Sequence, residues 1–148
     1  MTSFILLAVG ALALFALYVR LAPSDPARWH ADPLTATDPG SAGFLRRPAS
    51  DDPGYALEGP ALLAAFDTFV TGQPRVTRLA GTPDSGRITY IARSRLWGFP
   101  DYISVAAVET ESGGADLAIY SRLRFGAADL GVNQRRIEAW LSAFEPSS

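Results

Sequence analysis

The sequence predicts an α+β fold, with a four-stranded antiparallel sheet and two helices packed on one face. A single transmembrane helix and an extended proline-rich linker are expected to precede it. Residues 4–19 form an unbroken apolar run, and seven of the eleven prolines lie in residues 21–60. Apolar residues in 59–148 recur first at helical, then at strand, then again at helical spacing. We therefore divide the chain into an anchor at residues 1–22, a linker at 23–58 and a domain at 59–148.

The apolar run from Phe4 to Val19 is expected to anchor the protein in the lipid bilayer. As a helix it would be about 24 Å long, against about 30 Å for a hydrocarbon core. Tyr18 suits the interface, and Arg20 can extend its charge into water. A cleaved signal peptide is the main alternative, but no Lys or Arg precedes the run and no clean cleavage site follows it. We expect a single-pass, uncleaved anchor in a bacterial inner membrane; Arg20 and Arg28 weakly favour a cytoplasmic domain.

Composition narrows the classes of function. The chain has no cysteine, which excludes disulfides and thiolate chemistry, and a net charge of −2 gives no field that favours nucleic acid. His30 stands alone, so we expect no metal, no cofactor and no nucleic-acid partner. All thirteen basic residues are arginine. That bias reflects either codon usage or selection for bidentate contacts with anions.

The linker at 23–58 is expected to be extended because proline removes a backbone donor and blocks helix interiors. Four Asp-Pro dipeptides favour turns or extended chain. So long a stretch without regular secondary structure usually packs against another part of the protein or against a partner. Its aromatic and leucine side chains, Trp29, Phe44, Leu45 and Tyr55, are expected to contact either its own domain or a membrane-protein partner along the anchor and linker.

The domain pattern begins and ends with a helix. Gly59 and Pro60 start the first helix and Gly72 ends it. Four strands are predicted at residues 75–80, 87–97, 102–111 and 116–124. The last helix covers 134–144, with Asn133 as its N-cap. In the last strand Leu117, Ile119, Ser121 and Leu123 share one face, whereas Ala118, Tyr120, Arg122 and Arg124 share the other. One sheet face should therefore be apolar, and the other should carry arginines.

The segment from Tyr120 to Ile137 is the densest in charged residues and glycines. Its typed positions are Ser121-Arg122, Gly126, Asp129, Gly131, Asn133 and Arg136-Ile137, with Gly98-Phe99-Pro100-Asp101-Tyr102 and Tyr90-Ile91-Ala92 upstream. This pattern resembles the domain-of-unknown-function 1499 family over roughly residues 55–145. The resemblance implies no established activity. It does imply a periplasmic domain, since many members look exported or lipid-anchored. Phe44-Leu45 stands where members often carry a cysteine-containing segment.

Two interpretations of this segment stay open. In the structural one, Asp129 accepts from Arg122 or Arg136 and from turn amides, while Asp101 pairs with Arg122 across the strands. In the functional one, nearby arginines and the amides at the helix N-terminus bind a phosphate, carboxylate or lipid headgroup. The candidate binding residues are Arg122, Arg124, Asp129, Asn133, Arg135, Arg136 and Asp101.

Three functions are compatible with these observations. The first is a membrane-anchored, non-catalytic accessory or interaction protein, such as a small subunit of an inner-membrane complex. The alternative is a binding module for a small anionic or lipid ligand at the arginine-rich junction of strand and helix. The third is a hydrolase-like enzyme that uses Asp101 and Asp129 for acid–base chemistry. No nucleophile–base pair or phosphate loop in the sequence supports the third.

Overall fold

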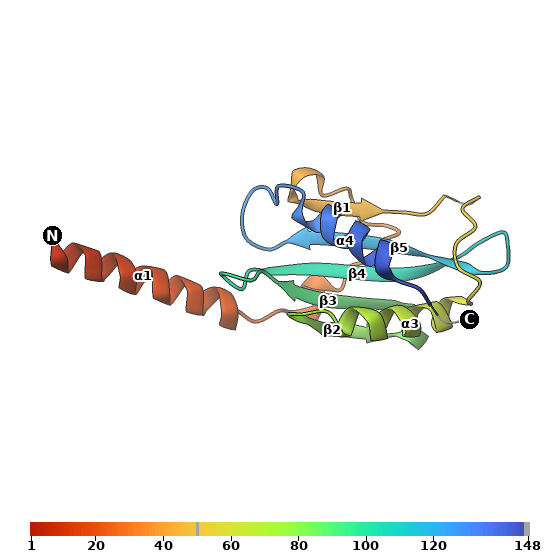
Figure 1. The fold of residues 1–148 in the computed structure, drawn as a ribbon, viewed down its shortest axis with the longest axis horizontal. Helices are drawn as coiled ribbons and strands as arrows, with labels where there is room; N and C mark the ends of the chain where they lie inside the picture. The colour runs from red at the N-terminus through yellow and green to blue at the C-terminus, as the bar shows by residue number, and fades with distance from the viewer. Residues whose placement is uncertain (50, 147–148) are drawn as a thin grey trace.

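The computed structural model describes residues 1–49 and 51–146, and shows one antiparallel sheet covered on one face by two helices (Figure 1). The helices are α1 (Thr2–Leu21), α2 (Pro26–Trp29), α3 (Gly59–Thr71) and α4 (Val132–Ala143), with short 3-10 turns at Gly40–Ala42 and Pro83–Ser85. The strands are β1 (Gly43–Arg46), β2 (Val76–Thr82), β3 (Arg87–Arg93), β4 (Pro100–Glu109) and β5 (Ala115–Leu123). The predicted α+β class is confirmed.

The sheet has five strands in the order β1-β5-β4-β3-β2, so the predicted count of four was wrong. The additional strand, β1, comes from the segment predicted as linker and pairs with the edge of β5. Gly43 permits this pairing, because a Cβ there would lie 2.1 Å from the carbonyl oxygen of Ser121. Arg46 then holds the other end of β1, through a 2.8 Å ion pair with the buried carboxylate of Asp116.

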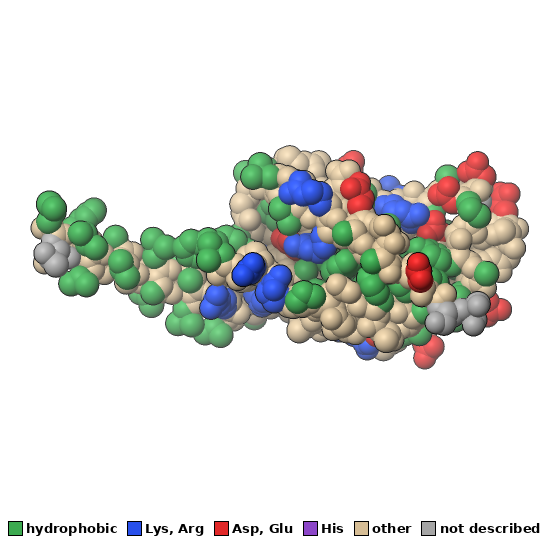
Figure 2. Space-filling view, viewed as in Figure 1, with side chains coloured by type: hydrophobic (Ala, Val, Ile, Leu, Met, Phe, Trp, Pro, Cys, Tyr) green, Lys and Arg blue, Asp and Glu red, His purple; other side chains and the backbone are tan. Residues whose placement is uncertain are grey.

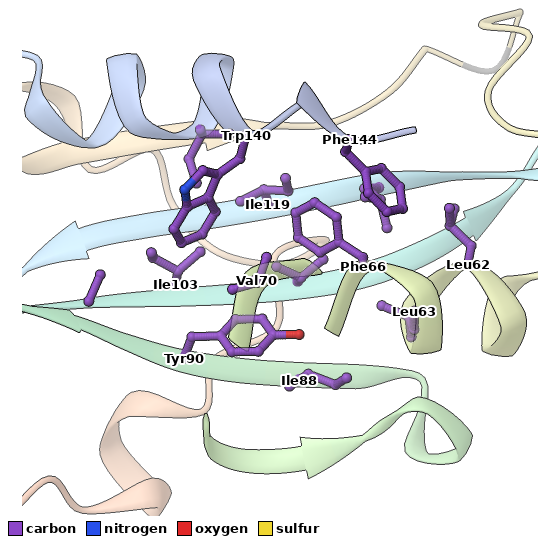
Figure 3. Close-up of a cluster of buried hydrophobic side chains, with 14 of the residues drawn as sticks. Leu62, Leu63, Phe66, Val70, Ile88, Tyr90, Ile103, Ile119, Trp140 and Phe144 are labelled. Atoms are coloured by element: carbon purple, nitrogen blue, oxygen red, sulfur yellow. The ribbon is translucent and has the colours of Figure 1, made fainter. Parts of the chain in front are cut away.

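The hydrophobic core lies between the sheet and the two covering helices (Figure 3). Figure 3 shows Phe66 from α3 and Phe144, just after α4, meeting above the sheet; their ring centroids are 5.0 Å apart. One polar cluster is buried beside this core. The hydroxyl of Tyr90 donates to Asp67 at 3.1 Å, and Asp67 also pairs with Arg78. Burial raises the pKa of Tyr90, and the Asp67 carboxylate raises it further, so this phenol stays a donor.

Residues 23–36, called the strap below, cover the opposite face of the sheet. Trp29 stacks on Tyr102 with ring centroids 3.9 Å apart and planes 12° apart. The guanidinium of Arg122 lies 5.0 Å from the centroid of the Trp29 ring. Polar contacts add to this, joining Ser24 to Tyr102, His30 to Thr89 and Arg124 to Pro23. Of the two alternatives given for Trp29, the structure shows the contact with its own domain. The strap therefore covers the sheet face opposite α3 and α4.

Helix α1 is long and apolar enough to cross a membrane over its 19 residues Ser3–Leu21. Figure 1 shows it projecting from one end of the domain. Three contacts hold its last turns there: Phe15 with Phe99 at 6.2 Å between centroids, Tyr18 with Phe125 at 6.2 Å, and Arg20 with the carbonyl of Leu96 at 3.2 Å. We call this the α1-proximal end; it carries the β3–β4 hairpin and the loop between β5 and α4.

Candidate functional site

A cleft of about 570 Å³ opens at the α1-proximal end of the domain. It lies between α4, the turn after α3 and the ends of the strands. Much of its lining is apolar, from Val76, Phe99, Leu123, Phe125, Val132 and Trp140. Its volume falls in the range of about 300–1,000 Å³ that small-molecule sites occupy. We call it the α1-proximal cleft.

Three arginines, Arg75, Arg93 and Arg95, are among the residues that line the cleft, and we call them the rim arginines. Among residues 1–49 and 51–146, the ion pairs are Arg46–Asp116, Arg78–Asp67, Arg87–Asp32 and Arg136–Asp101. None of these pairs uses a rim arginine. Arg75 also has a positive φ of 61°, a conformation that costs a residue with a Cβ roughly 1–2 kcal/mol. The rim is therefore positively charged, and part of it is held at a cost in backbone strain.

Asp101 and Arg136 form an ion pair, and both residues line the cleft. Their atoms Oδ2 and Nη2 are 2.9 Å apart, and their side chains are only 13% and 18% exposed. Desolvation raises the pKa of Asp101, although the Arg136 guanidinium opposes the rise. The prediction that Asp101 pairs with Arg122 was wrong. Asp101 lies opposite Leu123 in the β4–β5 register, so Arg122 points to the other face of the sheet.

Asp129 lies two residues before the N-cap of α4 and binds amides at that end of the helix. Its Oδ1 accepts from the amide of Gly131 at 2.8 Å, and its Oδ2 accepts from the amide of Asn133 at 2.9 Å. Desolvation would raise the pKa of Asp129, but these hydrogen bonds lower it below its ordinary value. The predicted contact of Asp129 with turn amides is confirmed. The predicted N-cap, Asn133, was wrong, because the helix is capped at Gly131, whose φ is 75°.

Asn133 instead joins the helix to the sheet. It is fully buried in the first turn of α4. Its Oδ1 accepts from the hydroxyl of Ser121 on β5 and from Arg136 at 3.0 Å, while its amide donates to Asp129 at 2.8 Å. Each of these polar atoms is therefore satisfied inside the protein. Asn133 positions the strand–helix junction and does not face a ligand.

The other predicted site residues lie outside the cleft. Arg122 donates to the carbonyl oxygens of Arg28 and Trp29 in the strap, at 3.2 and 3.4 Å. Arg124 donates to the carbonyl of Pro23 and to the hydroxyl of Tyr102, at 2.9 and 3.0 Å. Arg135 is exposed on α4 and donates to the carbonyl of Leu130. Of the seven predicted residues, the cleft therefore brings together Asp101, Asp129 and Arg136.

A family model described as "Protein of unknown function (DUF1499)" matches residues 48–144. The chain belongs to this family. No curated protein and no solved structure matches the chain. The match covers both helices of the sheet face and the whole α1-proximal cleft. The strap, β1 and α1 lie outside the matched residues.

The sequence patterns did not predict the rim arginines or the aromatic residues of the α1-proximal cleft. Arg75 precedes β2, Arg93 and Arg95 end or follow β3, and Phe99 and Phe125 lie in loops. No regular spacing along the sequence links these residues. They come together only because the sheet places the ends of their strands side by side. The one available signal was the pair Arg93 and Arg95 at the end of a predicted strand.

The pairing of its charged side chains limits what the α1-proximal cleft can do chemically. Both carboxylates that line it are occupied, Asp101 by a guanidinium and Asp129 by amides. Neither can take a proton from a substrate without giving up a partner, which counts against the hydrolase hypothesis. Among the rim arginines, Arg75 donates one N–H to the carbonyl of Arg93 at 3.3 Å, and Arg93 donates one to the carbonyl of Gly98 at 3.0 Å. Their remaining N–H groups and those of Arg95 carry charge that no carboxylate of the described residues pairs with.

Proposed function

We propose that this protein is a membrane-anchored module that binds a small anionic amphiphile in the α1-proximal cleft. One observation carries the proposal: arginines outside every ion pair of the described residues line the same cleft as aromatic and other apolar side chains. Arginine forms bidentate, charge-assisted hydrogen bonds with phosphate and carboxylate groups. The apolar part of the ligand would lie against Phe99, Phe125 and Trp140.

The ligand class follows from this division of the cleft. An inorganic ion would leave the aromatic and apolar lining unused, and a neutral lipid would leave the charges of the rim arginines unmatched. A phosphate or carboxylate head on a short apolar body fits both parts. Its source is either a membrane lipid or a water-soluble phosphorylated compound, and the two share this chemistry.

Ligand-dependent thermal stabilisation of the full chain in phosphatidylcholine nanodiscs tests the proposal. The probes are dihexanoyl phosphatidylglycerol, dihexanoyl phosphatidylcholine and inorganic phosphate. A ligand that binds only the folded state raises Tm by mass action. We expect a rise with the phosphatidylglycerol alone. An equal rise with inorganic phosphate would assign the site to a free anion, and no rise with any probe would contradict the proposal.

Matched variants locate the site. Replacing two of the three rim arginines, as Arg93→Gln with Arg95→Gln, should weaken binding of the phosphatidylglycerol at least about tenfold, because hydrogen bonds to charged groups are lost. Arg135→Gln removes an exposed arginine outside the cleft and should leave binding unchanged. If Arg135→Gln weakened binding and the double variant did not, the site would lie at the loop around Leu130, whose carbonyl accepts from Arg135.

For the location we propose a bacterial inner membrane with the domain in the periplasm. The apolar α1 and the export expected of the family support this side, although Arg20 and Arg28 weakly favour the other. The chain lacks cysteine, so Glu111→Cys provides a single thiol on the exposed turn between β4 and β5. A membrane-impermeant maleimide should label it in spheroplasts. Protection there, with labelling after lysis, would place the domain in the cytoplasm.

An accessory subunit of a membrane complex is the second candidate function. A hollow on α1 around Gly10, lined also by Leu6, Leu7, Ala11 and Leu14, favours it. Small residues allow close approach of a second transmembrane helix. Purification in mild detergent should then recover a stoichiometric membrane-protein partner, and Gly10→Leu should lose it. A clean monomer from the native membrane would count against this function.

A further inference from the structure

Apolar side chains gather at the tip of the β3–β4 hairpin, next to the end of α1. Leu96 is 75% exposed, and the half-buried Trp97 stacks on Phe99 with ring centroids 6.5 Å apart. An exposed leucine beside a tryptophan suits the interface between water and lipid, where aromatic rings are enriched. We propose that this tip inserts into the interfacial layer of the bilayer, with Arg93 and Arg95 on the phosphates of anionic phospholipids.

The contacts of α1 set the depth of the tip. The apolar span Ser3–Leu21 is about 28 Å long at about 1.5 Å per residue, so a hydrocarbon core of about 30 Å takes up all of it. Phe15 lies six residues before Leu21, which places it about 9 Å inside that boundary. Phe99 contacts Phe15, so it lies below the level at which the helix leaves the membrane. The hairpin tip must therefore enter the same layer.

The connection after α1 keeps the domain at this depth. Only residues 22–25 separate α1 from α2, which is part of the strap. Val19 is fully buried and Ala22 nearly so, although the rest of α1 is mostly exposed. Arg20 donates to the carbonyl of Leu96, which ties the helix end directly to the hairpin. The domain cannot turn its α1-proximal end away from the bilayer without breaking these contacts.

The charge around the tip selects an anionic surface. Arg20, Arg75, Arg93 and Arg95 line one hollow beside the hairpin. None of them forms an ion pair with a carboxylate of residues 1–49 and 51–146. Figure 2 shows basic side chains gathered where α1 joins the domain. Each arginine held near an anionic leaflet strengthens attachment severalfold.

This placement also gives the cleft an entrance. Phe99, Arg93 and Arg95 belong both to the hairpin region and to the cleft lining. If the cleft binds an anionic amphiphile, as proposed above, its mouth faces the headgroup layer and the ligand arrives from the leaflet. This last step rests on the proposed function, whereas insertion of the hairpin does not.

Spin labels on the full, naturally cysteine-free chain test the insertion. Leu96→Cys places a label at the tip, and Glu111→Cys places a matched label on the exposed β4–β5 turn, at the far end of the domain (Figure 1). The chain is reconstituted in vesicles of phosphatidylcholine and phosphatidylglycerol. We expect collisions with a water-soluble nickel chelate to be roughly tenfold rarer at position 96 than at 111, because polar solutes are excluded from the apolar layer. Collisions with oxygen should be more frequent at 96.

Equal chelate accessibility at the two positions would overturn the insertion. Adding Arg93→Gln and Arg95→Gln to the Leu96→Cys chain should leave the label inserted, because α1 sets its depth. It should lower the enrichment of phosphatidylglycerol around the protein at least about fivefold, since each basic residue contributes about that factor at an anionic surface. No change would overturn the assignment of the phosphates to these arginines. A water-exposed label at 96, in a chain that still binds the phosphatidylglycerol probe, would contradict the insertion and leave the proposed function standing. An inserted label in a chain that does not bind the probe would contradict the proposed function and leave the insertion standing.

Discussion

Replacing Arg136 with methionine should destabilise the protein by about 3 kcal/mol, the usual cost of removing one partner from a buried ion pair. Arg136 and Asp101 are 18% and 13% exposed, so water from the cleft replaces the lost guanidinium only in part. The same change removes a hydrogen bond to Asn133 at 3.0 Å and so weakens the junction between α4 and β5. Denaturant unfolding of the full chain in detergent measures the change in the free energy of unfolding.

The loss of stability in Arg136→Met should depend on pH. The folded-state pKa of Asp101 is raised above its ordinary value, so ionisation of Asp101 costs stability as pH rises through that pKa. Removing Arg136 raises this pKa further. The loss in Arg136→Met should therefore be largest at neutral pH, and it should shrink as pH falls through the raised pKa of Asp101.

Two controls separate the charge from the packing. Asp101→Asn added to Arg136→Met removes the unpaired charge and should recover much of the stability. Arg87→Met breaks the more exposed pair with Asp32, in which N and O are 3.6 Å apart, and should cost less than about 1 kcal/mol. Equal losses at Arg136 and Arg87, or a loss at Arg136 that does not depend on pH, would contradict the electrostatic argument.

Local sequence patterns predicted most of the fold because they report on neighbours along the chain. The two covering helices follow from apolar spacing and from Gly and Pro at their ends, and four strands follow from alternation. β1 was missed because its four residues, Gly43–Arg46, lie among prolines and all four are half-buried, so no alternation marks them. Its pairing depends on the approach of Gly43 to Ser121, a contact between segments far apart in sequence.

The site was less predictable, for the same reason. Strand alternation correctly placed Arg122 and Arg124 on the face opposite the covering helices. What they contact is the strap, about 90 to 100 residues earlier in the chain. The partner of Asp101 depended on the β4–β5 register, in which a shift of one residue exchanges faces. Sequence alone does not fix that register, so the pattern gave Asp101 the wrong arginine.

Trp29→Ala should cost about 3 kcal/mol or more, the range for large aromatic side chains lost from a buried site. Trp29 is 7% exposed and contacts both the ring of Tyr102 and the guanidinium of Arg122. Its loss would uncover Tyr102 and leave Arg122 without its aromatic partner in the strap. The free energy of unfolding measures the effect, and Leu34→Ala is the control. Leu34 is in the same segment but 46% exposed, so its loss should cost less than about 0.5 kcal/mol.

The same variant should detach the strap before the domain unfolds, because Trp29 is the large buried apolar side chain by which the strap packs on the sheet. Arg28 is exposed and next to Trp29, so trypsin should cut there much faster in Trp29→Ala than in the wild type or in Leu34→Ala. The cut would release α1 from a sheet that is still folded, since the core between the sheet, α3 and α4 does not use the strap. Cleavage at the wild-type rate would mean that the polar contacts of Arg122 and Arg124 hold the strap without Trp29.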